Sequence, residues 1–160
     1  MSESTMSNCL ELLQAMVHID SINATISQRP HPEAELAAFL DRQAARWGLS
    51  TRRLPVDEAY AGNVANTSSE GSFDLLVWRQ VSPTAPWILF ESHLDTVGVA
   101  GMTIDPFGAL VEAGRIYGRG ACDTKGSGAA MLWALREYAH KGRGRNNIAL
   151  LYAVDEEALK

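Results

Sequence analysis

The chain has 160 residues, a mass of 17.4 kDa and a formal net charge of −5. This length allows one domain with a hydrophobic core and is too short for two. With 46% hydrophobic and 21% charged residues, the composition is that of a folded globular protein rather than a disordered one. The acidic balance argues against a nucleic-acid partner, because phosphate backbones are bound through clustered Lys and Arg. The short basic runs at 52–53 and 141–145 are expected to be solvated surface.

Features of the whole chain also argue against membrane contact and disulfide bonding. No apolar stretch approaches the roughly 20 residues that span a bilayer, and the polar start lacks the pattern of a signal peptide. Cys9 and Cys122 are too few for a disulfide framework and are expected to be small buried residues. These features favour a cytoplasmic protein without a membrane or nucleic-acid partner.

The predicted elements alternate between helix and strand. Residues 1–7 are expected to be a disordered N-terminus, and residues 21–28 an irregular polar segment. Apolar residues at helical spacing, with Pro32 and Gly48 at the ends of the second helix, predict helices over 8–20, 32–47 and 125–140. The predicted strands are 50–56, which a loop through Gly62 and Asn63 follows, 73–78, 87–91, 116–117 and 148–154.

This alternation predicts an α/β fold with a mostly parallel sheet flanked by helices. The short connection between 73–78 and 87–91 favours neighbouring strands, and the apolar run at 148–154 predicts a strand buried on both faces. Polar residues follow directly on two strand ends: His93 and Asp95 on one, and residues 155–157 on the other. Open α/β sheets bind ligands beyond the carboxyl ends of their strands, so these residues indicate a site.

Three segments carry residues suited to metal chemistry, and each has a plainer alternative. His93 and Asp95 project the same way from an extended segment, so the carboxylate can orient the imidazole as a metal ligand; the alternative is a surface histidine near a capping Asp. Asp123 stands at the entry of the 125–140 helix, where on this segment alone N-capping is the favoured interpretation. The three acidic residues 155–157 are tolerable when a cation neutralises them, or they form a solvated acidic turn.

Taken together, the three segments favour a metal site. One imidazole and several carboxylates on separate elements match the nitrogen and oxygen ligands of zinc. Asp123 lies between the other two groups in the chain and could bridge two ions about 3.5–4 Å apart, as two-metal hydrolases require. A phosphoesterase that uses the same carboxylates is an alternative, because two-metal sites also serve phosphoryl transfer.

The order and spacing of these motifs resemble the M20 metallopeptidase family, which includes acetylornithine deacetylase, succinyl-diaminopimelate desuccinylase, aminoacylase and glutamate carboxypeptidase. His93 and Asp123 are 30 positions apart, and Asp123 and Glu156 are 33 apart, as in the family. The chain has Ser92 where the family usually has glycine. The motifs that carry the resemblance are Ser92-His93-Leu94-Asp95-Thr96-Val97, Asp105-Pro106-Phe107, Gly118-Arg119-Gly120, Asp123-Thr124-Lys125-Gly126 and Asp155-Glu156-Glu157.

The resemblance implies a zinc-exopeptidase-like catalytic domain and a role for each motif residue. His93 would bind one zinc ion, Glu157 a second, and Asp123 both; Co²⁺ or Mn²⁺ could replace zinc. Asp95 would orient His93. Glu156 would be the general base that takes a proton from the attacking water and returns it to the leaving amine. The resemblance also implies a cis bond between Asp95 and Thr96.

The family pattern continues with further ligands and a lid domain that pairs two subunits. Residues 8–160 are therefore expected to be the N-terminal part of a catalytic domain, inactive alone, with an apolar sheet edge exposed at 148–154. The whole protein would be a homodimer that hydrolyses N-acyl amino acids or small peptides, with a deacylase favoured over a dipeptidase or carboxypeptidase. An inert or partner-binding remnant is the alternative from another class.

Overall fold

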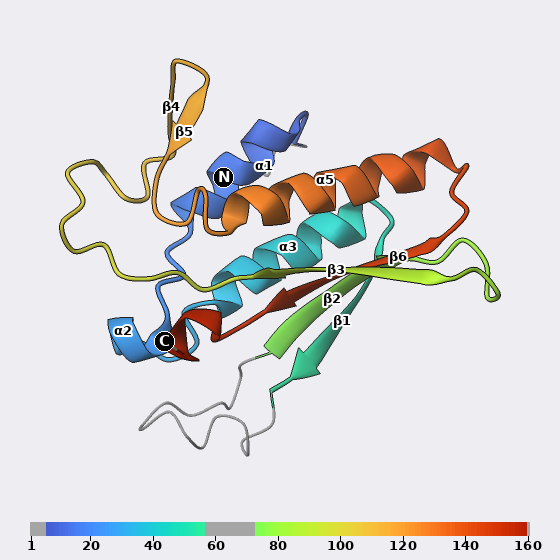
Figure 1. The fold of residues 1–160 in the computed structure, drawn as a ribbon, viewed down its shortest axis with the longest axis horizontal. Coiled ribbons are helices and arrows are strands. Elements are labelled where there is room, and N and C mark those ends of the chain that lie inside the picture. Colours follow the sequence, from blue (N-terminus) through green and yellow to red (C-terminus); the bar gives the residue numbers. More distant parts are fainter. Residues whose placement is uncertain (1–5, 57–72, 160) are drawn as a thin grey trace.

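The computed structural model describes residues 6–56 and 73–159, which form a four-stranded sheet with helices packed on it (Figure 1). The predicted features at residues 1–5 and at Gly62 and Asn63 lie outside the described residues. The strand order is β1-β2-β6-β3, beside a separate hairpin of β4 and β5. The strands are β1 Ser50–Pro55, β2 Phe73–Arg79, β3 Trp87–His93, β4 Leu110–Glu112, β5 Arg115–Tyr117 and β6 Asn147–Ala153.

The α/β class is confirmed, but the prediction of a mostly parallel sheet is wrong. Of the strand pairs in the described four-stranded sheet, β1–β2 and β2–β6 are antiparallel and β3–β6 is parallel. The parallel pair is the one joined through a helix, as a parallel crossover requires. The prediction that 73–78 and 87–91 are neighbours is also wrong, because β6 returns from that helix and inserts between β2 and β3.

The helices follow the sequence pattern closely. The described helices are α1 Cys9–His18, α2 Ala24–Ser27, α3 Ala34–Arg46, α5 Lys125–Lys141 and the short 3₁₀ helix η1 Glu156–Leu159. The three predicted helices are confirmed to within a few residues. α2 is a correction, since it lies in the segment expected to be irregular. The Asn23 side chain initiates it by accepting a hydrogen bond from the Thr25 backbone N–H at 2.9 Å.

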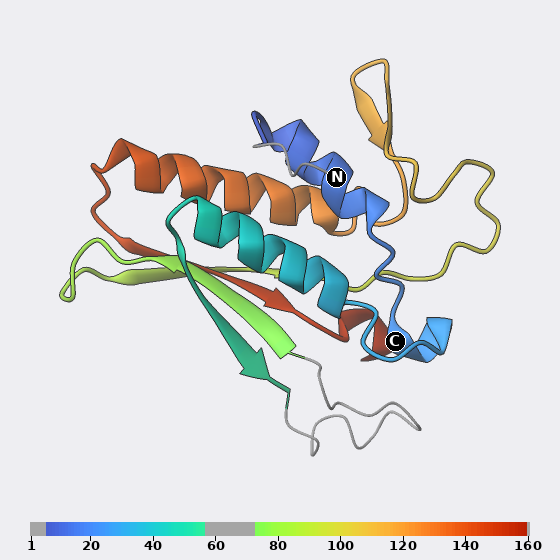
Figure 2. The same cartoon turned by 180° about the vertical axis from the view of Figure 1, so that it is seen from behind.

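Helices α3 and α5 pack on the same face of the sheet, and the core lies between these helices and the sheet (Figures 1 and 2). α3 contacts β1 and β2, α5 contacts β3 and β6, and α1 packs on α5. Each fully buried leucine in this layer contributes about 1.5–3 kcal/mol to folding through burial of apolar surface. The fully buried apolar side chains include Leu12, Met16, Leu36, Leu40, Leu75, Val77, Leu132, Leu150 and Tyr152.

The exposed apolar edge of the sheet is β3, not residues 148–154 as predicted. β6 has a strand on each side, so all of its residues are buried or half-buried. Among the described strands β3 pairs with β6 alone, and it exposes Trp87, Ile88, Leu89 and Phe90, with Leu89 61% exposed.

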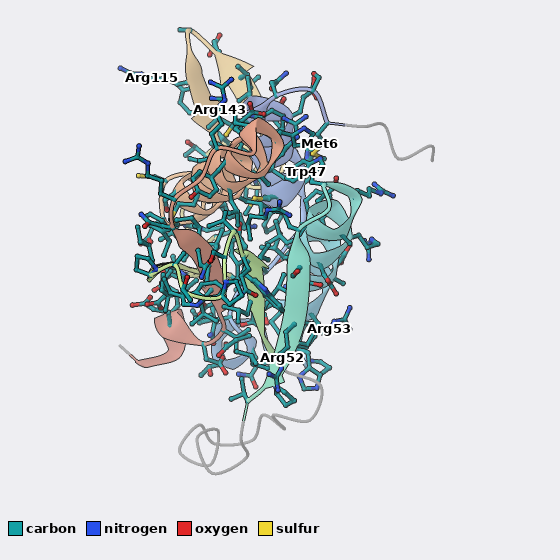
Figure 3. The ribbon with its side chains drawn as sticks, turned by 90° about the vertical axis from the view of Figure 1, so that its right-hand side faces the viewer. Met6, Trp47, Arg52, Arg53, Arg115 and Arg143 are labelled. Atoms are coloured by element: carbon teal, nitrogen blue, oxygen red, sulfur yellow. The ribbon has the colours of Figure 1, made fainter. Side chains whose placement is uncertain are left out.

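The arginines, the two cysteines and the composition of the helices can now be compared with the sequence predictions. Arg52 and Arg53 lie on β1, far from Arg115 and Arg143 (Figure 3), and Arg53 pairs with Asp41 at 3.0 Å. Cys9 is half-buried, but Cys122 is exposed, contrary to the prediction, because it lies in the loop that leads into α5. Among the described helices, none combines the length and apolar composition that crossing a bilayer requires.

Candidate metal centre

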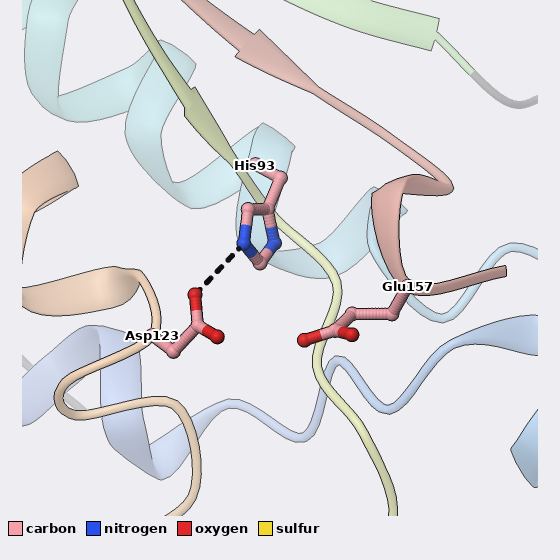
Figure 4. Close-up of side chains that lie close together, drawn as sticks. All are labelled: His93, Asp123 and Glu157. Atoms are coloured by element: carbon pink, nitrogen blue, oxygen red, sulfur yellow. Dashed lines mark hydrogen bonds and ion pairs between the residues drawn. The ribbon is translucent and has the colours of Figure 1, made fainter. Parts of the chain in front are cut away.

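The last residue of β3, His93, is anchored by Asp95 and faces Asp123. Its side chain is 10% exposed, and its Nδ1 lies 3.0 Å from the backbone oxygen of Asp95 and 3.3 Å from Asp95 Oδ1. Its Nε2 lies 3.1 Å from Asp123 Oδ1 (Figure 4). A carboxylate behind one ring nitrogen leaves the other free to act as a ligand, which is the usual arrangement behind metal-binding histidines.

The Asp95 carboxylate is fully buried and accepts hydrogen bonds from three further groups. Asn23 Nδ2 donates to Oδ2 at 2.8 Å, the Glu157 backbone N–H donates to Oδ2 at 2.8 Å, and the Glu156 backbone N–H donates to Oδ1 at 3.2 Å. Burial alone would raise the pKa of Asp95, but the contacts with His93, Asn23 and Glu157 outweigh it and lower the pKa. Asp95 is therefore ionised and ties the end of β3 to the turn after β6.

The electrostatic environment strongly favours a proton on His93. Hydrogen bonding to Asp95 raises the pKa of His93 to about 9, against the opposing effect of burial and with a further contribution from Asp123. A cation can replace this proton in neutralising the carboxylates around the ring.

His93, Asp123 and Glu157 converge on one point from three separate elements (Figure 4). One ligand atom from each lies within 4.8 Å of the others. Asp123 comes from the loop before α5 and is 65% exposed, whereas Glu157 in η1 is 7% exposed. Glu156 stands at the margin, with Oε2 3.8 Å from His93 Nε2 and its side chain 44% exposed.

The donor set fits a zinc ion. Two ligand atoms bound tetrahedrally to zinc at about 2.0–2.1 Å are about 3.3 Å apart, close to the 3.1 Å between His93 Nε2 and Asp123 Oδ1. One imidazole and two carboxylates give the mixed nitrogen and oxygen set that zinc takes in catalytic sites. These three side chains could hold one ion, and a second ion would need further donors.

The loop before α5 presents Asp123 to the cluster instead of capping the helix. The N-cap residue of α5 is Thr124, without a side-chain cap, so N-capping by Asp123 is not what the structure shows. Gly120 allows the approach of this loop: its φ is +76°, and a Cβ there would lie 2.7 Å from Thr96 Cγ2. Among the described residues the cis peptide bond is Asp123–Thr124 and not Asp95–Thr96, so the prediction of a cis Asp95–Thr96 bond is wrong.

Asp155 is the acidic residue that the structure does not bring into the cluster. Its carboxylate accepts from Asn23 Nδ2 at 3.2 Å. Burial, with Asp95 nearby, raises its pKa. The acidic residues of the run therefore diverge, because Asp155 turns toward Asn23 while Glu157 faces His93 and Asp123.

Two residues near the centre escaped the sequence analysis. Asn23 is fully buried and contacts both Asp95 and Asp155. Lys125 is 1% exposed and donates from Nζ to the Ile19 backbone oxygen at 2.7 Å, and burial lowers its pKa to about 8. Lys125 lies inside a quoted motif, but no local signal marks Asn23.

Comparisons with known proteins agree with this geometry. A model described as peptidase family M20/M25/M40 matches residues 89–160. The succinyl-diaminopimelate desuccinylase of Rhodospirillum centenum is 33% identical over 114 residues, covering 69% of this chain and 27% of that protein. The enzyme of the same name from Beijerinckia indica subsp. indica is 30% identical over 152 residues, covering 92% of this chain and 35% of that protein.

The fold is also that of a solved member of this family. The M20 metallo-carboxypeptidase Sso-CP2 from Sulfolobus solfataricus superposes with a TM-score of 0.74 at 26% identity, covering 96% of this chain and 32% of that one. The chain belongs to the peptidase M20 family. It spans about a third or less of the length of the curated relatives described above.

Proposed function

We propose that the whole protein is a metal-dependent hydrolase that cleaves the amide bond of an N-acyl amino acid or small peptide. The observation that carries this proposal is the convergence of His93, Asp123 and Glu157 within 4.8 Å, in a chain of the M20 family. The buried Asp95 behind His93 supports it, since a merely surface histidine would have no need of such an anchor.

The residues of the centre have three separate roles: metal binding, proton transfer and orientation of a ligand. His93, Asp123 and Glu157 would hold the zinc ion, and Asp123 would be the ligand shared with a second ion. When bound, zinc supplies a Lewis acid that polarises the scissile carbonyl and makes water more acidic. Glu156, at the margin of the cluster and partly exposed, takes a proton from the attacking water and returns it to the leaving amine. Asp95 holds the His93 ring in position.

A deacylase is the favoured activity, because the curated relatives described above are named succinyl-diaminopimelate desuccinylases. A carboxypeptidase is the second candidate, supported by the fold and the 26% identity shared with the carboxypeptidase Sso-CP2. Both reactions break an amide bond next to a carboxylate, so one metal centre serves either.

The rest of the proposal concerns the whole protein. It is a cytoplasmic homodimer, with a lid domain and the remaining metal ligands supplied by chain beyond the part described. The unpaired cysteines, Cys9 and Cys122, agree with a reducing compartment. Nucleic acid and membranes are not among its partners.

The first test is binding of Zn²⁺ to the 160-residue chain, measured by isothermal titration. We expect His93→Ala and Glu157→Gln to weaken binding by at least about tenfold. Glu35→Gln removes an exposed carboxylate from the first turn of α3 and should leave binding unchanged. Equal binding by wild type and Glu157→Gln would contradict the proposed centre.

The second test is hydrolysis by the whole protein of an N-succinyl amino acid, an N-acetyl amino acid and a dipeptide. We expect the N-succinyl substrate to be cleaved fastest, and Glu156→Gln to abolish turnover while Zn²⁺ binding is kept. Cleavage of a phosphate ester but of no amide would overturn the proposed chemistry.

A further inference from the structure

A short extended segment lies beside the metal centre and is held there by backbone hydrogen bonds. Ile22 forms a parallel bridge with Thr96. The Asn23 N–H donates to the Thr96 oxygen at 2.9 Å, and the Thr96 N–H donates to the Ser21 oxygen at 3.0 Å. The Ser21 hydroxyl donates to the Leu94 oxygen at 2.8 Å. Residues 21–23 therefore run parallel to the segment that carries Asp95 and are hydrogen-bonded to it.

This pairing points the Asn23 side chain at two acidic groups. Its Nδ2 donates to Asp95 Oδ2 at 2.8 Å and to Asp155 Oδ1 at 3.2 Å. Its Oδ1 accepts from the Thr25 N–H at 2.9 Å. Both hydrogens of the amide are thus used to hold together two carboxylates that repel one another.

The Asp95 carboxylate passes this constraint on to the centre. Its Oδ1 contacts His93 Nδ1 and accepts the Glu156 backbone N–H, while its Oδ2 accepts the Glu157 backbone N–H. If Asp95 rotated, both the ring of His93 and the turn that presents Glu157 would lose a hydrogen-bond partner. Asn23 is the described side-chain donor, besides His93, that fixes the rotation of Asp95.

We propose that Asn23 is a positioning residue of the metal centre: its amide clamps Asp95 and Asp155 and so sets the geometry of His93 and Glu157. This inference rests on the proposed function only in that the cluster binds a metal ion. A plain helix-capping role is the competing explanation, because Asn23 also begins α2.

The two roles can be separated because Ser and Asp cap helices as well as Asn does. Asn23→Ser keeps the cap and removes both amide donors. Asn23→Asp keeps the cap and the shape, but places a third carboxylate against Asp95 and Asp155. Asn8, which caps α1 in the same way on the exposed surface, gives matched controls in Asn8→Ser and Asn8→Asp.

The first measurement is the affinity of each variant for Zn²⁺ alone. Loss of a residue behind a metal ligand typically costs about 10–100-fold in affinity, so we expect a loss in this range for Asn23→Ser and a larger loss for Asn23→Asp. Both Asn8 variants should bind like wild type. Unchanged affinity in Asn23→Ser would overturn the proposal, and this variant decides the matter if Asn23→Asp does not fold.

The second measurement uses metal-free protein, so that failure of the Asn23 proposal can be distinguished from failure of the proposed metal function. Hydrogen exchange of the Glu156 and Glu157 backbone amides is compared with that of amides in α5. We expect Asn23→Ser to speed exchange at 156 and 157 while α5 stays protected; equal acceleration everywhere, or none, would leave Asn23 a helix cap and reject the proposal. Absence of Zn²⁺ binding by wild type would count against the proposed metal function alone.

Discussion

At the scale of single residues, the proton on His93 is one contribution to how the chain responds to pH, beside those of the buried Glu33 and Lys125, whose pKa values burial shifts to about 8. The pKa of His93 is about 9 in the folded chain and 6.5 ordinarily. A raised pKa stabilises the fold fully below about 6.5, and this contribution is lost as pH rises through about 9. A metal ligand must instead be neutral, so Zn²⁺ affinity should rise over the same interval.

Thermal unfolding of the chain between pH 6 and 9.5, with and without Zn²⁺, tests this prediction. We expect the metal-free melting temperature to fall with pH while the increase caused by Zn²⁺ grows. His93→Gln should lessen the fall in melting temperature and remove the growth of the Zn²⁺ effect, whereas His140→Gln, an exposed change in the last turn of α5, should keep both trends. Trends of unchanged size in His93→Gln would show that other groups are responsible.

Single residues of the site differ in whether the sequence alone could have identified them. His93, Asp123 and the acidic run 155–157 could be selected because each is a metal-ligand type next to the end of a predicted strand or the start of a helix, and the family resemblance then singled out Glu157. Asn23 could not, because it acts through a contact with Asp95 that is 72 positions away in the chain. Residues that orient ligands have no fixed type or spacing, so they become visible only when the chain is folded.

At the scale of elements, the contact between α5 and the sheet depends on Gly128. A Cβ at this position would lie 2.9 Å from Ser92 Oγ and 3.1 Å from Tyr152 Cε1. Ser92 cannot turn away freely, because its hydroxyl is bonded to Thr124 Oγ1 at 2.8 Å. Alanine favours helix by about 1 kcal/mol over glycine, but overpacking a core costs about 1–3 kcal/mol. We expect Gly128→Ala to destabilise the chain.

A double-mutant cycle with Ser92→Gly checks this by urea unfolding. Removing the Ser92 hydroxymethyl group makes room for the new methyl group, so Gly128→Ala should cost less in that background. The two changes would be additive if the helix and strand did not meet at this point. Additivity would therefore refute the packing argument.

The elements themselves were predictable to different degrees. The helices carried local signals, such as the αL glycine at 142 that ends α5, and α5 was placed within one residue. Strand order carried no such signal. It depends on where β6 lands after the α5 crossover, and β6 lies between β2 and β3 with Leu150 and Tyr152 in the core.

At the scale of the whole molecule, the described part leaves one edge of the sheet strongly apolar. Trp87, Leu89 and Phe90 are 51%, 61% and 45% exposed on the edge strand β3. A groove of about 420 Å³ between α5 and the sheet is lined by Phe90, Met131, Leu135 and Tyr138, among other residues. Exposed apolar edge strands promote pairing with other chains.

We therefore predict that the purified 160-residue chain self-associates as its concentration rises. Leu89→Lys should reduce this, because a charge on an edge strand opposes strand pairing. Leu110→Lys is the matched control: Leu110 is also an exposed leucine on a strand, 55% exposed, but in the separate β4–β5 hairpin. Sedimentation velocity at several concentrations would distinguish the variants. Equal reduction by both would mean that general charge, rather than the β3 edge, controls association, whereas a reduction confined to Leu89→Lys would locate the contact at this strand.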